Sequence, residues 1–181
     1  MAPTVDPARL VFLDETGVTT NLIRRYGRSL RGHRVTDHTP HGRWRTSTFI
    51  AALRITGLTA PGVLDGPMDG DSFLAYVGQI LVPTLHPGDV VIADNLAAHH
   101  VAGVRALIEA AGAALWYLPP YSPDFNPIEL CFAKLTALLR AARCRSIDTL
   151  WPLLGASLAR FSPNECQAYI RHCGYTAAMG S

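Results

Sequence analysis

The order of strand-like and helix-like segments is the feature that most constrains the fold of this chain. Three apolar segments of strand type come before any helix-like segment, and they cover residues 9–14, 46–56 and 62–64. The connections between them are too short for helical crossovers or, over residues 24–45, show little helical periodicity. Because parallel neighbours require a long crossover, we expect these three strands to pair antiparallel.

A strand–helix–strand unit follows in the middle of the chain. Helical spacing over residues 69–81 is followed by an apolar strand at 89–94, a helix that ends at Gly112 and a strand at 113–118. Such a unit places its two strands in parallel. The sequence therefore predicts an α/β domain of ribonuclease H-like type, whose mixed sheet has three antiparallel strands and then two parallel strands, flanked by helices. A Rossmann domain would need a helix directly after the first strand.

The last third of the chain is predicted to be helical. The proline-rich segment 119–123 is a rigid loop that leads to Asn126 as an N-cap and Pro127 as the first helical residue. Two short helices are expected at 147–160 and 163–172, so that residues 1–181 form a single domain. The buried face of the helix after Pro127 is expected to consist of Ile128, Phe132, Leu135 and Leu139.

Composition limits the size and the location of the protein. Of the 181 residues, 49% are hydrophobic, which is enough for one core and too little for a second large domain. The sequence has no apolar stretch of membrane-spanning length and no signal-peptide pattern, so we expect a soluble cytoplasmic protein. The four cysteines form no CxxC pair and are expected to be reduced thiols.

Three acidic residues stand at the ends or starts of predicted elements. Asp14 and Asp94 each end an apolar strand, and Glu129 lies just inside a helix. The first and fourth strands are neighbours in the predicted sheet, so the two aspartates are expected side by side. Magnesium and manganese prefer oxygen ligands, and two such ions about 4 Å apart can activate an attacking hydroxyl and stabilise a leaving oxygen. The pattern points to a two-metal site for cutting and joining nucleic acid.

Each acidic residue also has a simpler explanation. Asp14 could begin a turn, and Asp94 with Asn95 could form an Asx-turn at the end of its strand. Asn126 and Glu129 match a capping box, in which the glutamate bonds back to the cap. The metal site is favoured because all three carboxylates fall at the same end of the predicted elements.

Three motifs resemble the catalytic motifs of one enzyme family. They are Asp14-Glu15-Thr16-Gly17, Asp94-Asn95 followed by His99, and Leu118-Pro119-Pro120-Tyr121-Ser122-Pro123-Asp124-Phe125-Asn126-Pro127-Ile128-Glu129. They are similar to those of DDE transposases of the mariner superfamily, and most closely to the bacterial insertion-sequence branch called IS six-thirty. That branch commonly has the 34-residue gap that separates Asp94 from Glu129 here.

The resemblance implies a function and a set of site residues. Asp14, Asp94 and Glu129 would be the catalytic ligands of two Mg²⁺ or Mn²⁺ ions, with Asn95 and His99 in supporting positions. The domain would cut DNA at transposon ends with water and then use the freed 3′-hydroxyl to attack target DNA, with a preference for the dinucleotide TA. The resemblance also implies DNA as a partner, association with the nucleoid, and a homodimer or larger assembly on DNA.

The chain departs from the family pattern in two ways. The family usually has a tryptophan three residues after the catalytic glutamate, and this chain has Phe132 there. Members of the superfamily usually carry N-terminal helix-turn-helix modules that recognise the transposon ends. This chain begins about a dozen residues before Asp14 and is expected to lack them.

Arginines are concentrated between the first two predicted strands. They are Arg24, Arg25, Arg28, Arg31, Arg34, Arg43 and Arg45. Phosphate contacts from such a segment would give salt-dependent, non-specific DNA affinity, whereas a solvated loop is the simpler interpretation. A second group, Arg140, Arg143 and Arg145, is interpreted as the positive end of its helix.

Two other functions fit parts of the pattern. A ribonuclease H-like nuclease would share the fold and the metals but stop after hydrolysis, and the proline-rich block argues against it. An inactive transposase-derived protein that binds DNA or a partner is favoured by the missing end-recognition modules. The intact acidic triad opposes that interpretation.

Overall fold

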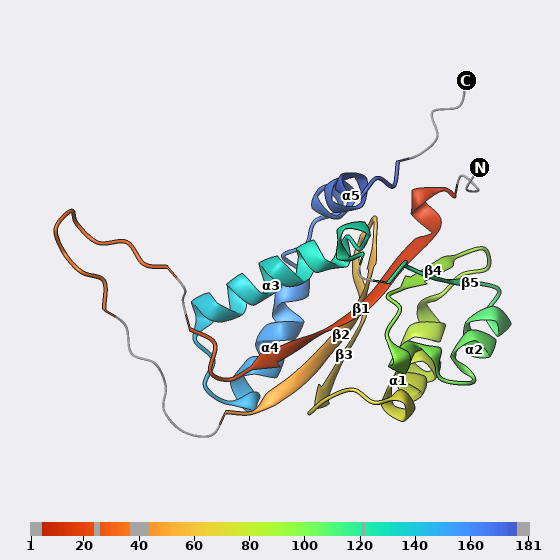
Figure 1. Ribbon diagram of the computed structural model, residues 1–181, viewed down its shortest axis with the longest axis horizontal. Coiled ribbons are helices and arrows are strands. Elements are labelled where there is room, and N and C mark those ends of the chain that lie inside the picture. Colours follow the sequence, from red (N-terminus) through yellow and green to blue (C-terminus); the bar gives the residue numbers. More distant parts are fainter. Residues whose placement is uncertain (1–4, 24–25, 37–43, 121, 177–181) are drawn as a thin grey trace.

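A five-stranded mixed sheet forms the centre of the molecule (Figure 1). The computed structural model describes residues 5–23, 26–36, 44–120 and 122–176. The strand order is β3-β2-β1-β4-β5. The strands are β1 (Leu10–Thr19), β2 (Thr46–Arg54), β3 (Gly57–Asp65), β4 (Val90–Ala93) and β5 (Ala114–Tyr117).

The pairing directions are those of the predicted sheet. β2 pairs antiparallel with β1 and β3, whereas β4 pairs parallel with β1 and β5. The register of the β1–β4 ladder ends with Leu13 opposite Ala93, so the next residues, Asp14 and Asp94, emerge side by side. The predicted ribonuclease H-like architecture is confirmed.

The sheet separates two hydrophobic cores because side chains alternate along each strand. Leu10 and Phe12 of β1 belong to the core on one face, and Val11 and Leu13 belong to the core on the other. The first core is closed by α3 (Ile128–Ala142), α4 (Ile147–Leu158) and α5 (Pro163–His172), and the second by α1 (Gly70–Tyr76) and α2 (Val104–Ala110). Figure 1 shows the two groups of helices on opposite sides of the sheet.

Several predicted bounds were wrong, for reasons that lie in the pairing. β1 continues to Thr19 instead of ending at Asp14, because it keeps pairing with β2 after β4 has diverged. β3 begins at Gly57 instead of residue 62, because residues 57–59 extend the ladder with β2. The helix predicted over 69–81 is α1 followed by a wider π turn, Val77–Leu81.

Helix α3 packs on the sheet with the face that the sequence predicted. Ile128, Phe132, Leu135 and Leu139 are all buried, and Cys131 joins them. All four cysteines are free thiols, as expected. Within the described ranges, no helix combines the length and the apolar character needed to cross a membrane.

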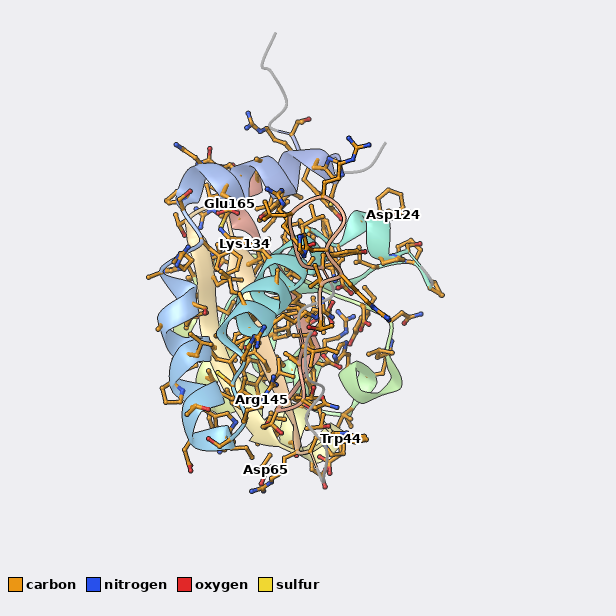
Figure 2. All side chains as sticks on the ribbon, turned by 90° about the vertical axis from the view of Figure 1, so that its left-hand side faces the viewer. Trp44, Asp65, Asp124, Lys134, Arg145 and Glu165 are labelled. Atoms are coloured by element: carbon orange, nitrogen blue, oxygen red, sulfur yellow. The ribbon has the colours of Figure 1, made fainter. Side chains whose placement is uncertain are left out.

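Lys134, the single lysine of the chain, ties α3 to α5. Its Nζ donates to the two carboxylate oxygens of Glu165 at 2.7 and 2.6 Å, and to the carbonyl of Arg160 at 2.7 Å. The Tyr169 hydroxyl donates to the same glutamate at 2.6 Å. Figure 2 shows Lys134 and Glu165 on these adjacent helices. The contact holds the C-terminal helix against the helix that carries Glu129.

Candidate active site

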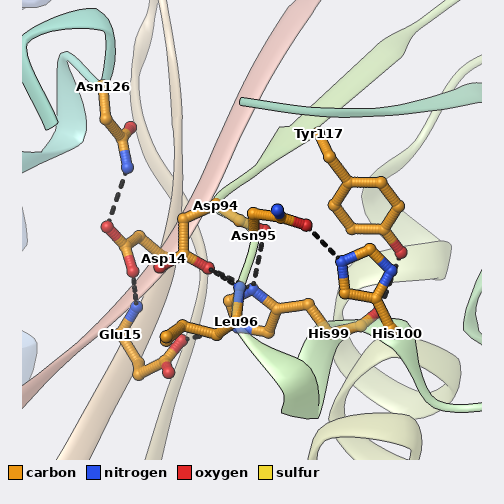
Figure 3. Close-up of polar contacts among 9 residues, drawn as sticks. All are labelled: Asp14, Glu15, Asp94, Asn95, Leu96, His99, His100, Tyr117 and Asn126. Carbon is orange, nitrogen blue, oxygen red and sulfur yellow. Dashed lines mark hydrogen bonds and ion pairs between the residues drawn. The ribbon is translucent and has the colours of Figure 1, made fainter. Parts of the chain in front are cut away.

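Asp14 is a buried carboxylate in the central strand, with 5% of its surface exposed. Its Oδ1 accepts a hydrogen bond from the backbone N–H of Glu15, and its Oδ2 accepts one from Nδ2 of Asn126, both at 2.8 Å (Figure 3). Burial raises the pKa of Asp14 to about 8, and the neighbouring carboxylates of Asp94, Glu129 and Glu15 add to the shift. The side chain is therefore held in one orientation in a crowded acidic environment.

Asn126 does not cap α3 as the sequence predicted. The cap position is Pro127, without a side-chain cap bond, and the Asn126 side chain turns instead to Asp14. The capping box is also not formed, since the Glu129 side chain makes no hydrogen bond to any described residue while its backbone N–H donates to the Asn126 carbonyl at 3.2 Å. In this orientation the NH₂ group of Asn126 donates to Asp14, while its side-chain oxygen, which a cap would use as the acceptor, has no partner among the described residues.

Asp94 directly follows β4, and its carboxylate contacts a buried histidine. Its Oδ1 lies 2.5 Å from Nδ1 of His99 and accepts a bond from the Leu96 backbone N–H at 3.2 Å (Figure 3). The other ring nitrogen of His99, Nε2, lies 2.9 Å from Oε2 of Glu15. His99 thus bridges two carboxylates that come from neighbouring strands.

The environment of His99 favours its charged form. Only 1% of its surface is exposed, and its ring packs on Phe73 with centroids 4.3 Å apart. Burial opposes the charge, but the hydrogen bonds to Asp94 and Glu15 outweigh it and raise the pKa of His99 to about 10. An imidazolium donates from both nitrogens, which matches two carboxylate partners. His99 is therefore a fixed cation beneath the acidic site.

Glu129 approaches from the first turn of α3 and is exposed. Its pKa is raised, mainly by partial burial and further by the negative charges of Asp94 and Glu15. Its carboxylate in turn raises the pKa of Asp14. Asp94 and Glu129 therefore both lie close enough to Asp14 to raise its pKa.

The three acidic residues line a common cavity of about 340 Å³. Asp14, Asp94 and Glu129 line it together with Asn95 and Asn126. Among the described residues, no three His, Cys, Asp or Glu side chains are gathered closely enough to hold one ion together. Magnesium, however, is usually held by one or two carboxylates, with water and substrate phosphate completing its shell. The oxygen donors of this cavity fit Mg²⁺ or Mn²⁺ on that pattern.

The arginine-rich segment lies elsewhere. Arg24, Arg25 and Arg43 are outside the described residues. Arg28, Arg31 and Arg34 are exposed in the stretch 26–36, which extends away from the sheet in Figure 1, and Arg45 forms an ion pair with Asp65. No described arginine lines the acidic cavity.

Arg145, expected to be part of the positive end of α3, has a specific partner instead. It lies beyond the last residue of α3 and donates to the carbonyl of Leu22 at 2.8 Å. The contact anchors the start of the connection between β1 and β2.

Two residues of the site were missed by sequence reasoning. The sequence indicates Glu15 only as a part of the first motif, although alternation along β1 turns it to the face opposite Asp14, where His99 lies. It indicates Asn126 only as a cap. The signal for Glu15 was the strand period, whereas the sequence has no signal for the rotamer of Asn126.

A ribonuclease H-like sheet with three carboxylates around one cavity defines a class of metal-dependent enzymes that act on phosphodiesters. The family profile of DDE superfamily endonucleases matches residues 9–151, and the chain belongs to this family. No curated protein sequence matches the chain.

Solved structures of Mos1 transposase are similar in fold. A pre-cleavage Mos1 transpososome superimposes with a TM-score of 0.73 at 17% identity, over 92% of this chain and 52% of that one. The Mos1 mariner paired-end complex with Mn has a TM-score of 0.70 at 16% identity, over 93% of this chain and 52% of that one. The isolated catalytic domain of Mos1 mariner transposase has a TM-score of 0.66 at 16% identity, over 92% of this chain and 76% of that one. The chain thus spans about half the length of the transposase in the complexes.

Proposed function

We propose that this chain is the catalytic domain of a DDE transposase of the IS six-thirty branch, which cuts and joins DNA strands. The observation that carries the proposal is the convergence of Asp14, Asp94 and Glu129 on one cavity. The similarity of fold to Mos1 structures, among them a paired-end complex with Mn, supports it.

In this proposal the three carboxylates hold two Mg²⁺ or Mn²⁺ ions. The bound ions would activate the attacking hydroxyl and stabilise the leaving oxygen of the phosphodiester. Asn126 and the Glu15 backbone N–H keep the Asp14 carboxylate oriented toward the cavity. His99 holds Asp94 and supplies a positive charge on the side of the site away from the solvent. Glu129, exposed and without a hydrogen bond to any described side chain, is free to adjust to the substrate.

The partners follow from the same proposal. DNA ends and target DNA are the substrates, with insertion at TA, and two copies of the protein act together on paired ends. Arg28, Arg31 and Arg34 are exposed and carry no ion pair in the structure as described, so they are available for phosphate contacts. We also propose that Arg24, Arg25, Arg43 and Arg45 contribute to this contact.

Metal-dependent nicking of supercoiled DNA, and joining of a labelled 3′-hydroxyl end to that DNA, test the proposal. Asp94→Asn and Glu129→Gln are expected to abolish both reactions in Mn²⁺ while the proteins stay folded. Asp148→Asn, which changes an exposed carboxylate on α4, is the matched control. Undiminished activity in both site variants would contradict the assignment. Nicking without joining would instead indicate a nuclease.

An inactive DNA-binding protein is the second candidate. It is favoured by the observation that, in the described part of the chain, no three His, Cys, Asp or Glu side chains lie close enough together to hold one metal ion. Calorimetry of Mn²⁺ binding with and without DNA separates the two candidates. Binding that requires DNA supports the enzyme, and no binding in either condition supports the inactive protein.

A further inference from the structure

A second histidine, His100, contacts the site without touching any of the three carboxylates. Its Nε2 lies 2.5 Å from Oδ1 of Asn95, which lines the acidic cavity (Figure 3). Both side chains are exposed, so burial alone does not bring them together. Specific polar and aromatic contacts, and not packing in a core, therefore hold the two side chains together.

The ring of His100 is held by an aromatic support. It stacks on Tyr117, the last residue of β5, with centroids 4.1 Å apart and planes 26° apart. The Tyr117 hydroxyl donates to the backbone carbonyl of His99 at 2.8 Å, and the Arg105 guanidinium lies 5.8 Å from the Tyr117 centroid. Arg105 is itself tied to β5 by a bond to the Leu115 carbonyl at 3.1 Å. The imidazole thus rests on a platform built on the edge strand of the sheet.

This contact decides which end of the Asn95 amide is free. With Nε2–H of His100 donating to Oδ1, the oxygen is engaged and the NH₂ group is left for a partner outside the described chain. An NH₂ group binds an anionic oxygen and has no affinity for a cation. The polarity of Asn95 at the cavity is therefore that of a donor.

The cavity otherwise offers few side-chain donors. Asn126 directs its amide to Asp14, and the Ser122 hydroxyl donates to the Pro120 carbonyl at 3.3 Å. Among the described lining residues, Asn95 is the one whose side-chain donor group makes no hydrogen bond to another described residue. A donor in this position can bind a non-bridging oxygen of a phosphodiester that enters the cavity.

We propose that Asn95 donates its side-chain NH₂ to a phosphate oxygen of bound DNA and that His100 is the positioning residue that fixes this orientation. The proposal rests on the function proposed above, because it assigns the contact to the same cavity. It gives Asn95 a role toward the substrate and not toward the metal.

Two substitutions of Asn95 separate these roles. Asn95→Ala removes the donor, and Asn95→Asp keeps an oxygen for His100 while it replaces the NH₂ group by a second oxygen. If Asn95 donates to phosphate, both variants lower kcat/KM for Mn²⁺-dependent nicking by about tenfold to a hundredfold, and Asp is at least as harmful as Ala. Activity of Asn95→Asp close to that of the unchanged protein would show an oxygen ligand and overturn the proposal.

Two substitutions of His100 test the positioning role. His100→Phe keeps a ring on Tyr117 but has no donor, and His100→Gln restores an N–H at similar reach without the ring. We expect His100→Phe to lower kcat/KM by about tenfold and His100→Gln to recover most of that loss. The double variant Asn95→Ala with His100→Phe should be no worse than Asn95→Ala alone, because His100 acts through Asn95. Additive losses, or equal defects in Phe and Gln, would contradict this.

A readout without turnover keeps the inference separate from the proposed function. In Ca²⁺, addition of duplex DNA to ¹⁵N-labelled protein should shift the side-chain NH₂ signal of Asn95, which is identified by its absence in Asn95→Asp. The shift should persist in His100→Gln and be lost in His100→Phe. If the unchanged protein shows the shift but no nicking, the proposed function fails and this contact stands. If it nicks DNA without the shift, the contact fails and the proposed function stands.

Discussion

The side-chain amide of Asn126 donates a hydrogen bond of 2.8 Å to Oδ2 of Asp14, across 112 positions of sequence. Asn126 lies two residues before α3, so this bond fixes the start of the helix that carries Glu129 relative to the central strand. The amide oxygen of Asn126 is buried without a partner in the structure as described. Leaving a buried oxygen unpaired is unfavourable, so the interaction with Asp14 is kept at some expense of stability.

Asn126→Ala should therefore affect metal binding more than folding. Loss of the donor releases the Asp14 carboxylate, and we expect Mn²⁺ affinity and nicking activity to fall by about tenfold to a hundredfold. Stability should change by only about 1 kcal/mol, because the variant also removes the unpaired oxygen. Mn²⁺ titration and thermal unfolding measure the two effects. Asn164→Ala, on the exposed side of α5, is the control, and an equal loss of affinity there would contradict the interpretation.

The raised pKa of Asp14 predicts how stability depends on pH without metal. Asp14 ionises near its ordinary pKa of 3.8 when unfolded and at about 8 when folded, so the folded state holds an extra proton between these values. Stability should therefore fall as pH rises from about 4 to about 8, with a slope of up to about 1.4 kcal/mol per pH unit from this group. Denaturant unfolding in EDTA measures this slope.

His99 extends the same effect to higher pH. Its pKa is raised from 6.5 to about 10, so its contribution is complete below pH 6.5 and is lost as pH rises toward 10. Asp14→Asn should remove the slope between pH 4 and 6.5, reduce it between pH 6.5 and 8, where both groups contribute, and leave the His99 part above pH 8 in place. Mn²⁺ should flatten the dependence, because the metal favours the ionised carboxylates. A metal-free stability that rises from pH 5 to 8 would contradict both assignments.

Much of the architecture could be predicted because it depends on local patterns. Periodicity and connection length are local properties of the sequence, and they sufficed for the sheet topology and for the buried face of α3. The end of β1 could not be predicted, because Asp14 to Thr19 are kept in a strand by β2, which is distant in sequence. The three carboxylates around the cavity were also anticipated, since each ends or begins an element.

The hydrogen bonds that support those carboxylates were less predictable. Asn126 has the sequence context of a cap, and only the nearness of Asp14 gives its amide a different partner. Glu15 and His99 are 84 positions apart, and neither has a local feature that identifies the other. Rotamers and long-range pairs follow from the assembled sheet and not from the pattern of any one segment.

The Glu15 partner of His99 gives a direct spectroscopic prediction. Glu15→Gln removes a negative charge from the 2.9 Å contact with Nε2 but keeps an oxygen acceptor. The pKa of His99 should fall, since its charged form loses one of the two carboxylates that stabilise it. A proton NMR titration of the imidazole signals measures the change. Asp148→Asn serves as the control, and an unchanged pKa of His99 in Glu15→Gln would rule out the bridge.

The Lys134–Glu165 contact predicts a stability effect that leaves the chemistry intact. Lys134→Met keeps the apolar stem but removes Nζ, which donates to Glu165 and Arg160 and lies 4.7 Å from the centroid of the Phe161 ring. We expect a loss of about 1.5–3 kcal/mol in the free energy of unfolding, as for hydrogen bonds to charged groups.

That loss corresponds to several degrees in melting temperature for a chain of this size. Glu165→Gln should lose less, because an oxygen acceptor remains for both Lys134 and Tyr169. Metal-dependent nicking should be unchanged at a temperature where each variant is folded, since neither side chain lines the acidic cavity. A drop in kcat of Lys134→Met without a drop in stability would mean that the contact between α3 and α5 positions Glu129 and does not merely hold the helices together.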